Sequence, residues 1–201
     1  MVSCDRILQE AVVELHEGIR RTADVAYLLG TRAWPAPGQP GTAELIARTH
    51  PVQVVNLNRE FLDVFRGLVT ERGQDWEKVL SVDARFSDSG EIPRGLASYV
   101  QATWTRLVER LTAPGVLFVH EAGLLARYFD QGGHDALVTL QQASRRPSGA
   151  PHGLWLLCPA ESALDTPQID GRTVEVLDDS ERVVLTSTFL EKLRGEPGSA
   201  A

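Results

Sequence analysis

The sequence predicts a layered α/β fold: a mostly parallel sheet flanked by helices, with a helical segment ahead of it. Two continuous apolar runs, Val116–Val119 and Leu154–Leu157, have the composition of strands that are buried on both faces of a parallel sheet. Amphipathic helical patterns separate these runs, and the connections are long enough to be crossovers between parallel strands. We therefore expect the two runs to lie side by side.

The first part of the chain is predicted to be helical and separate from the sheet. Apolar residues recur at steps of three and four through residues 4–29, which indicates an amphipathic helix. Residues 31–41, TRAWPAPGQPG, contain three prolines and two glycines, a composition typical of a loop. We therefore divide the chain into a helix and Pro/Gly-rich loop (1–42), an α/β domain (43–194) and a disordered tail (195–201).

The α/β domain opens with a strand and a helix. Residues 51–57 are rich in β-branched side chains and predict a strand that ends near Asn56. Asn58 is suited to be the N-cap of a helix over 59–72, and Gly73 to end that helix. Residues 76–80 predict a further turn or two of helix, and the polar segment 83–95 predicts a loop.

The later elements follow from the same spacing rules. A helix, a strand, a short helix and a second long helix lead to the strand at 154–157, and two more strands and a last helix end the domain. The last two strands are close enough to form a hairpin. The predicted ranges are 96–111, 116–119, 124–129, 135–145, 154–157, 173–177, 182–185 and 186–194.

Composition excludes several classes of protein. With 201 residues and 43% hydrophobic content the chain fits one ordinary core, and its formal charge of −7 disfavours non-specific binding to nucleic acid or to an anionic membrane. No apolar span approaches the ~20 residues that a membrane crossing needs. Cys4 and Cys158 lie far apart without metal-ligand spacing, so we expect a reduced, cytoplasmic protein with no metal site.

Polar residues follow three of the predicted strands. Ligands of open α/β sheets bind outside the carboxyl ends of the strands, so these residues are the candidates for a shared site. They are Asn56 with Asn58, His120 with Glu121, and Cys158 with Glu161.

Glu121 allows two interpretations. An acid directly after a buried strand can hold a Mg²⁺-bound water or activate an attacking water, which is the Walker B role in phosphoryl transfer. The simpler interpretation is an acid in the first turn of the helix that follows, where the helix dipole favours negative charge. His120 stands where the Walker B pattern usually has Asp.

The chain has no phosphate-binding P-loop. The pattern GxxxxGK[ST] needs a lysine that follows glycine and precedes a hydroxyl residue, and neither Lys78 nor Lys192 meets that requirement. We therefore expect no autonomous P-loop ATPase, and ATP with Mg²⁺ as a cofactor only if a partner chain completes the site.

Other side chains allow other chemistry. Cys158 could be a nucleophile with His120 as its base, in a small hydrolase that also uses Glu121, although a buried and inert cysteine explains the same position. Arg127, Arg145 and Arg146 could be arginine fingers or helix-end cations.

Several segments resemble one family. LLARYFDQGG (124–133), ASRRPSGAPHGLWLLCPAESALDTPQIDG (143–171) and RTVEVLDDSERVVL (172–185) look like the C-terminal, ATPase-like region of large proteins in the phage growth limitation and BREX anti-phage systems. HPVQVVNLNREFLDVFRGLV (50–69) resembles the strand and helix ahead of that region. The resemblance implies a P-loop NTPase-like fold with 116–119 as the Walker B strand, Glu121 as its acid and 154–157 as the sensor strand.

The chain departs from that family where the Walker A strand and loop should precede these elements. The resemblance therefore implies a degenerate, non-catalytic or partner-completed module of a defence complex, acting through protein contacts. Self-association through the apolar face of residues 4–29 is a further expectation, and the small cytosolic hydrolase is the alternative.

Overall fold

The computed structural model describes residues 25–30, 52–89, 91–146, 148–160, 164–177 and 181–185. The predictions for the loop at 31–41, the helix at 186–194, the tail and Glu161 fall outside these ranges, as does most of the predicted helix at 4–29. The strands of the main sheet are β1 (Val25–Gly30), β2 (Val52–Asn56), β3 (Val116–His120), β4 (Gly153–Ala160) and β7 (Arg182–Leu185).

The strands form one five-stranded sheet in the order β2-β3-β4-β1-β7. β2, β3 and β4 are parallel, with Val54 opposite Phe118 and Phe118 opposite Trp155. This arrangement confirms that the two apolar runs at 116–119 and 154–157 lie side by side. All five residues of β3 are buried, as its apolar composition predicts for a central strand.

The other two strands correct the sequence prediction. β1 runs antiparallel to β4, with Val25 opposite Ala160 and Gly30 opposite Trp155, so the end of the predicted helix at 4–29 is a strand. β7 pairs with β1 and not with residues 173–177, so the predicted hairpin is wrong. β1 forms backbone hydrogen bonds with the edge of β4 that would otherwise be open. The spacing of apolar residues within 4–29 cannot reveal these hydrogen bonds, because β4 lies far along the chain.

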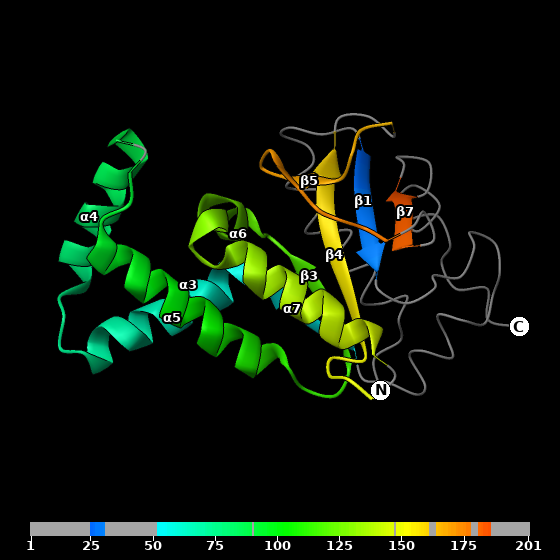
Figure 1. The fold of residues 1–201 in the computed structure, drawn as a ribbon, viewed down its shortest axis with the longest axis horizontal. Helices are drawn as coiled ribbons and strands as arrows, with labels where there is room; N and C mark the ends of the chain where they lie inside the picture. The colour runs from blue at the N-terminus through cyan, green and yellow to red at the C-terminus, as the bar shows by residue number, and fades with distance from the viewer. Residues whose placement is uncertain are drawn as a thin grey trace, which may run out of the picture.

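In the part of the chain that the structure describes, four helices and a 3₁₀ turn pack together on one side of the sheet, and a fifth helix, α4, stands at their outer end (Figure 1). Because β2-β3 and β3-β4 are neighbouring parallel strands, their two crossovers both lie on this face. The helical elements are α3 (Leu57–Glu71), α4 (Trp76–Ser89), α5 (Arg94–Leu111), α6 (Gly123–Arg127), η1 (Phe129–Gln131) and α7 (Gly133–Arg145).

The helix α3 begins two residues earlier than predicted. Asn56, the last residue of β2, is its N-cap, and its Oδ1 accepts a hydrogen bond from the N–H of Arg59 at 3.0 Å. The prediction of Asn58 as the cap is therefore wrong, because the strand passes into the helix without an intervening residue. The helix ends as predicted, with Gly73 at a φ of 65°.

The helix α4 continues to Ser89 and so replaces the first part of the predicted loop at 83–95, whereas residues 91–93 are irregular, as that prediction expects. Asp75 starts it by accepting a hydrogen bond from the N–H of Glu77 at 2.9 Å. Asp83 then receives hydrogen bonds from Arg127 at 2.9 Å and from the Tyr128 hydroxyl at 2.5 Å, both from the region of α6. The Ser/Asp/Gly content of this segment favours a loop locally, but these contacts and the packing of Phe86 against Tyr128 hold it as a helix.

Tyr128 makes part of this contact sensitive to pH. Burial, followed by its hydrogen bond to Asp83, raises the pKa of Tyr128 to about 12, above the usual value near 10. A raised pKa favours the protonated form in the folded state, so the associated stability is complete below about pH 10 and is lost as the pH rises towards about 12. We expect a loss of about 2 kcal/mol across that window by chemical denaturation.

The comparison variant for this prediction is Tyr128→Phe. It lacks the titrating hydroxyl, so its free energy of unfolding should fall less steeply over the same pH range than that of the wild type. Parallel curves for the two proteins would contradict the assignment.

A small hairpin lies beyond β4. Strands β5 (Gln168–Ile169) and β6 (Arg172–Thr173) are joined by Asp170 and Gly171, which both have positive φ, 45° and 81°, as a two-residue type I′ turn requires. The predicted strand at 173–177 is limited to Thr173 in the structure. Ile169 and Val174 are buried in the main core, so the hairpin is anchored against the helices.

Candidate functional site

The carboxyl ends of β2 and β3 meet as expected. Asn56 lies opposite His120 in the sheet register. Asn58, in the first turn of α3, holds the segment after β3 twice: its N–H donates to the Glu121 carbonyl at 2.9 Å, and its Oδ1 accepts from the N–H of Leu124 at 2.8 Å. Asn56 and Asn58 therefore organise this edge of the sheet through helix capping and backbone contacts.

Glu121 occupies an unusual backbone position at this edge. Its φ of 53° lies in the left-handed region, which costs an ordinary side chain about 1 kcal/mol or more. The residue is exposed, and no group in the described residues hydrogen-bonds or ion-pairs with its carboxylate. The helix α6 begins only at Gly123, so Glu121 is not the first-turn acid of that helix. The strained residue therefore exposes a carboxylate that has no partner within the described ranges, beside the central strand.

Replacement of Glu121 by glycine should stabilise the fold. Glycine adopts a positive φ without steric cost, so we expect a gain of about 0.5 to 1 kcal/mol in the free energy of unfolding. Glu121→Ala is the matched control, because it removes the carboxylate and keeps the strain. If Glu121→Ala raised the free energy of unfolding as much as Glu121→Gly, the increase would come from removal of the charge, and relief of backbone strain would not explain it.

Asp170 joins this edge from the β5–β6 hairpin. A Cβ placed on Gly123 would lie 2.8 Å from an Asp170 carboxylate oxygen, so this second acid lies against the start of α6, two residues beyond Glu121. Asp170 is not among the site residues predicted from the sequence. The Asp-Gly pair inside a short hairpin pattern was the available signal for the turn, but its position over α6 depends on tertiary packing.

His120 and Cys158 lie on opposite faces of the sheet. Cys158 shares the helix-covered face with Leu156 and Val119, whereas His120 alternates with Val119 and lies near Phe118, with ring centroids 6.1 Å apart. Cys158 is fully buried, and burial raises the pKa of its thiol. The structure therefore does not bring the two residues together as a nucleophile and its base.

Two of the three arginine candidates already have partners. Arg127 donates to Asp83, and Arg145 donates from Nε and from a terminal nitrogen to the two oxygens of Glu181, at 2.9 and 2.7 Å. Both side chains hold secondary-structure elements together. Arg146 is exposed just after α7. Glu161 lies outside the described residues.

Comparisons of the chain with protein-family models, with curated proteins and with solved structures found no match. Among the residues that the structure describes, no helix is long and apolar enough to cross a membrane. The same residues contain no group of three or more His, Cys, Asp or Glu side chains placed to hold a metal ion.

Proposed function

We propose that this chain is an ATPase-like module of a bacterial anti-phage defence system of the BREX or phage growth limitation type. In this proposal it lacks autonomous catalysis, acts through contacts with protein partners, and offers Glu121 to a nucleotide that a partner holds. The observation that carries the proposal is the Glu121 carboxylate, exposed and without a partner in the described residues, directly after the central strand of three parallel strands.

The strain at Glu121 supports a role beyond stability. A left-handed conformation at a non-glycine residue persists where the surrounding structure enforces it, and such positions concentrate at functional sites. Here Asn58 enforces it through the carbonyl of Glu121 and the N–H of Leu124. A first-turn acid, the simpler interpretation, has less support because α6 starts two residues later.

The direction of β1 supports the lack of autonomous catalysis. A P-loop connects the carboxyl end of a strand to the N-terminus of a helix, with the phosphates at that edge of the sheet. β1 is antiparallel to β4, so Gly30 at its carboxyl end lies at the opposite edge from Glu121. Together with the missing GxxxxGK[ST] pattern, this geometry favours completion by a partner or loss of hydrolysis altogether.

The test is an ATPase assay of the purified chain, alone and mixed with a P-loop protein encoded beside it. We expect no hydrolysis by the chain alone with Mg²⁺, and complex formation with the P-loop protein. If the chain completes the site, Glu121→Gln should reduce hydrolysis by the complex by about 100-fold or more, as loss of a group that stabilises the transition state does.

Glu91→Gln, a change at another exposed acid, is the control and should leave that rate unchanged. A complex whose hydrolysis ignores Glu121→Gln would support the purely non-catalytic version. Hydrolysis by the isolated chain, or failure to bind any P-loop protein of its own gene neighbourhood, would refute the proposal.

A further inference from the structure

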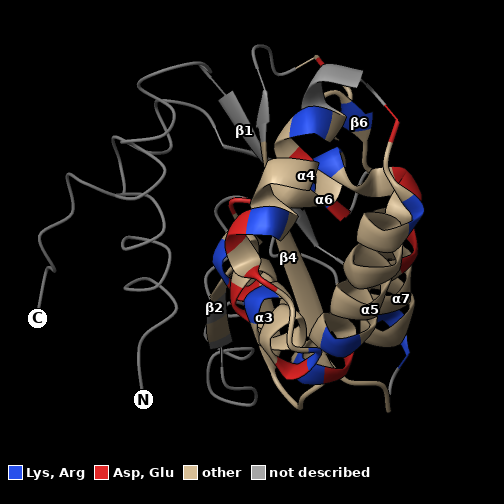
Figure 2. Cartoon of the chain, turned by 90° about the vertical axis from the view of Figure 1, so that its left-hand side faces the viewer, with Lys and Arg blue, Asp and Glu red and all other residues tan. Residues whose placement is uncertain are grey.

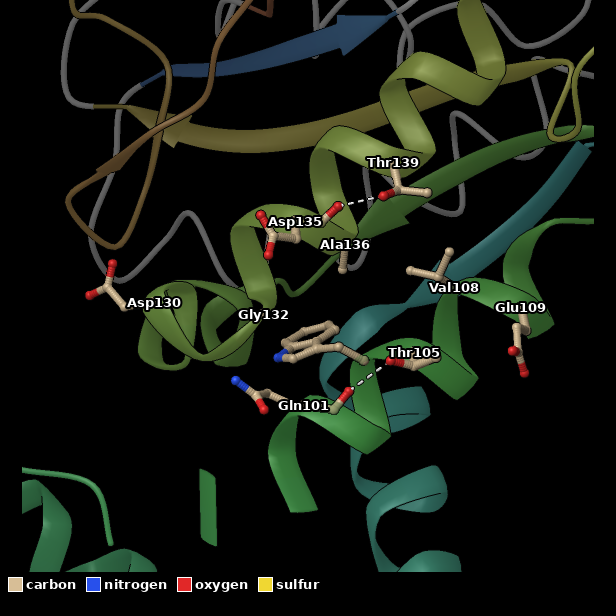
Figure 3. Close-up of a pocket in the computed structure, with 10 residues that line it drawn as sticks. Gln101, Thr105, Val108, Glu109, Asp130, Gly132, Asp135, Ala136 and Thr139 are labelled. Atoms are coloured by element: carbon tan, nitrogen blue, oxygen red, sulfur yellow. Dashed lines mark hydrogen bonds between the residues drawn. The ribbon is translucent and has the colours of Figure 1, made fainter. Parts of the chain in front are cut away.

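A groove lies between α5 and the η1–α7 segment, away from the strand ends (Figure 3). Its volume is about 420 Å³, within the range of small-ligand pockets. The lining residues come from successive turns of two adjacent helices, so the groove is elongated along them. They include Trp104 and Glu109 from α5, and Asp130, Gly132 and Asp135 from the other wall.

One hydrogen-bond donor in this α5–α7 groove has no acceptor among the described residues. Trp104 is 3% exposed, and its Nε1 is a buried polar atom to which no group in that part of the chain is hydrogen-bonded. The adjacent ring atom, Cδ1, lies 3.5 Å from the point where a Cβ on Gly132 would be, so this edge of the indole faces Gly132 on the opposite wall. An unpaired buried donor is costly, and a ligand that supplies an acceptor would remove that cost.

The charges of the groove select a cation. Three lining residues are acidic, Glu109, Asp130 and Asp135, and none is Lys or Arg. Asp130 is paired with Arg172 at 3.0 Å, and Asp135, which is 91% exposed, lies 3.7 Å from Nδ1 of His134. Glu109 is exposed. Carboxylates on both walls favour a guanidinium or ammonium group.

We propose that the α5–α7 groove binds a basic segment of a partner protein. A backbone carbonyl of that segment accepts the hydrogen bond from Trp104 Nε1, and a neighbouring arginine side chain pairs with the acidic walls. A polypeptide carries backbone acceptors and cationic side chains together, and an extended chain suits a groove that follows two helices. This site does not depend on the role proposed for Glu121, and its test uses no nucleotide.

The test is an NMR titration of the ¹⁵N-labelled full chain with N-acetyl-arginine amide. The titration is monitored through the indole N–H signals of the four tryptophans. The indole signal that is missing from the spectrum of Trp104→Phe belongs to Trp104. If that variant does not fold, Trp→Phe changes at the other three tryptophans identify the Trp104 signal by elimination. We expect a downfield shift of the Trp104 signal with a dissociation constant on the order of 1 mM, as a ligand of this size allows.

Two further probes separate the components of recognition. N-acetyl-norleucine amide carries only the acceptors and butylguanidinium only the cation, and each should bind at least about tenfold more weakly than the arginine amide. Equal binding of butylguanidinium would show a site for small cations and would overturn the proposal. So would the absence of binding by the arginine amide, or binding that leaves the Trp104 signal unmoved.

A charge-matched pair of variants locates the site. Glu109→Gln with Asp135→Asn should weaken binding of the arginine amide about tenfold, whereas Asp63→Asn with Glu77→Gln, two exposed acids of α3 and α4, should leave it unchanged. Because both double variants remove the same charge, a general electrostatic effect would weaken binding in both and would contradict a site in the groove.

Discussion

Phe61→Ala should cost about 4 kcal/mol in the free energy of unfolding, more than any other single change predicted for this protein. Phe61 on α3 is 0% exposed, and its ring contacts Trp104 at 4.5 Å, Tyr128 at 5.6 Å and Phe65 at 5.7 Å between centroids. These rings come from α3, α5 and the end of α6, so the truncation leaves a cavity where three helical elements meet. Thermal denaturation should show a fall in Tm of roughly 8 to 16 °C for a chain of this size.

The neighbouring residue provides the control. Leu62→Ala removes a leucine that is 42% exposed on the same helix and should change stability by no more than about 0.5 kcal/mol. Phe61→Leu keeps most of the volume and should fall between the two. Equal losses for Phe61→Ala and Leu62→Ala would mean that the aromatic cluster does not hold the helices together.

Local sequence pattern was sufficient to predict the elements that depend on the properties of their own residues. The apolar runs of β3 and β4, the apolar stripe of α5 and the glycine that ends α3 were all readable, because each expresses a period or a backbone preference of its own residues. The charged residues of α3 and α4 are of both signs, as Figure 2 shows.

Elements that depend on a distant partner were misread. Val25–Gly30 continues a helical spacing, yet it is a strand because β4, far along the chain, offers it hydrogen bonds. The segment 83–89 has a loop-like composition, yet Asp83 is held by Arg127 and Tyr128 from α6. In both cases tertiary contacts outweigh a local preference of a few tenths of a kcal/mol per residue.

The candidate site was predictable in position and not in detail. The position of Glu121 follows from the rule that polar groups at the carboxyl ends of parallel strands share an edge. That His120 and Cys158 are on opposite faces depends on the register that sets Leu117 opposite Leu154, and no local pattern encodes that register. The left-handed backbone of Glu121 and the approach of Asp170 to Gly123 likewise require coordinates.

The second large effect is expected at a pair that joins α7 to the start of β7. Glu181 accepts from Nε and a terminal nitrogen of Arg145 and also from the N–H of Leu177 at 2.9 Å, and the two side chains are only 10% and 22% exposed. Glu181→Gln keeps the shape and leaves the guanidinium without a counter-charge. We expect a loss of about 3 kcal/mol by chemical denaturation, since breaking a buried pair exposes the desolvation cost of the remaining charge.

A second pair with two short contacts on the surface is the matched control. Arg106 donates to both oxygens of Glu71 at 2.8 and 2.7 Å, but these side chains are 48% and 56% exposed. Glu71→Gln should therefore cost less than about 1 kcal/mol, and about 1 M salt should remove most of that effect while leaving the effect of Glu181→Gln. Similar losses at the two pairs would mean that burial does not strengthen the contact at Glu181.

Replacing both Arg145 and Glu181 distinguishes two explanations of the loss. Either the ion pair itself stabilises the fold, or the loss in Glu181→Gln is only the cost of leaving the Arg145 charge buried without a partner. In the variant Arg145→Met with Glu181→Leu no buried charge remains, and apolar side chains of similar volume fill the space, so its stability should recover to within about 1 kcal/mol of the wild type. The N–H of Leu177 loses its acceptor in this variant, which sets the residual cost. A double variant as unstable as Glu181→Gln would show that the ion pair itself stabilises the junction of α7 and β7.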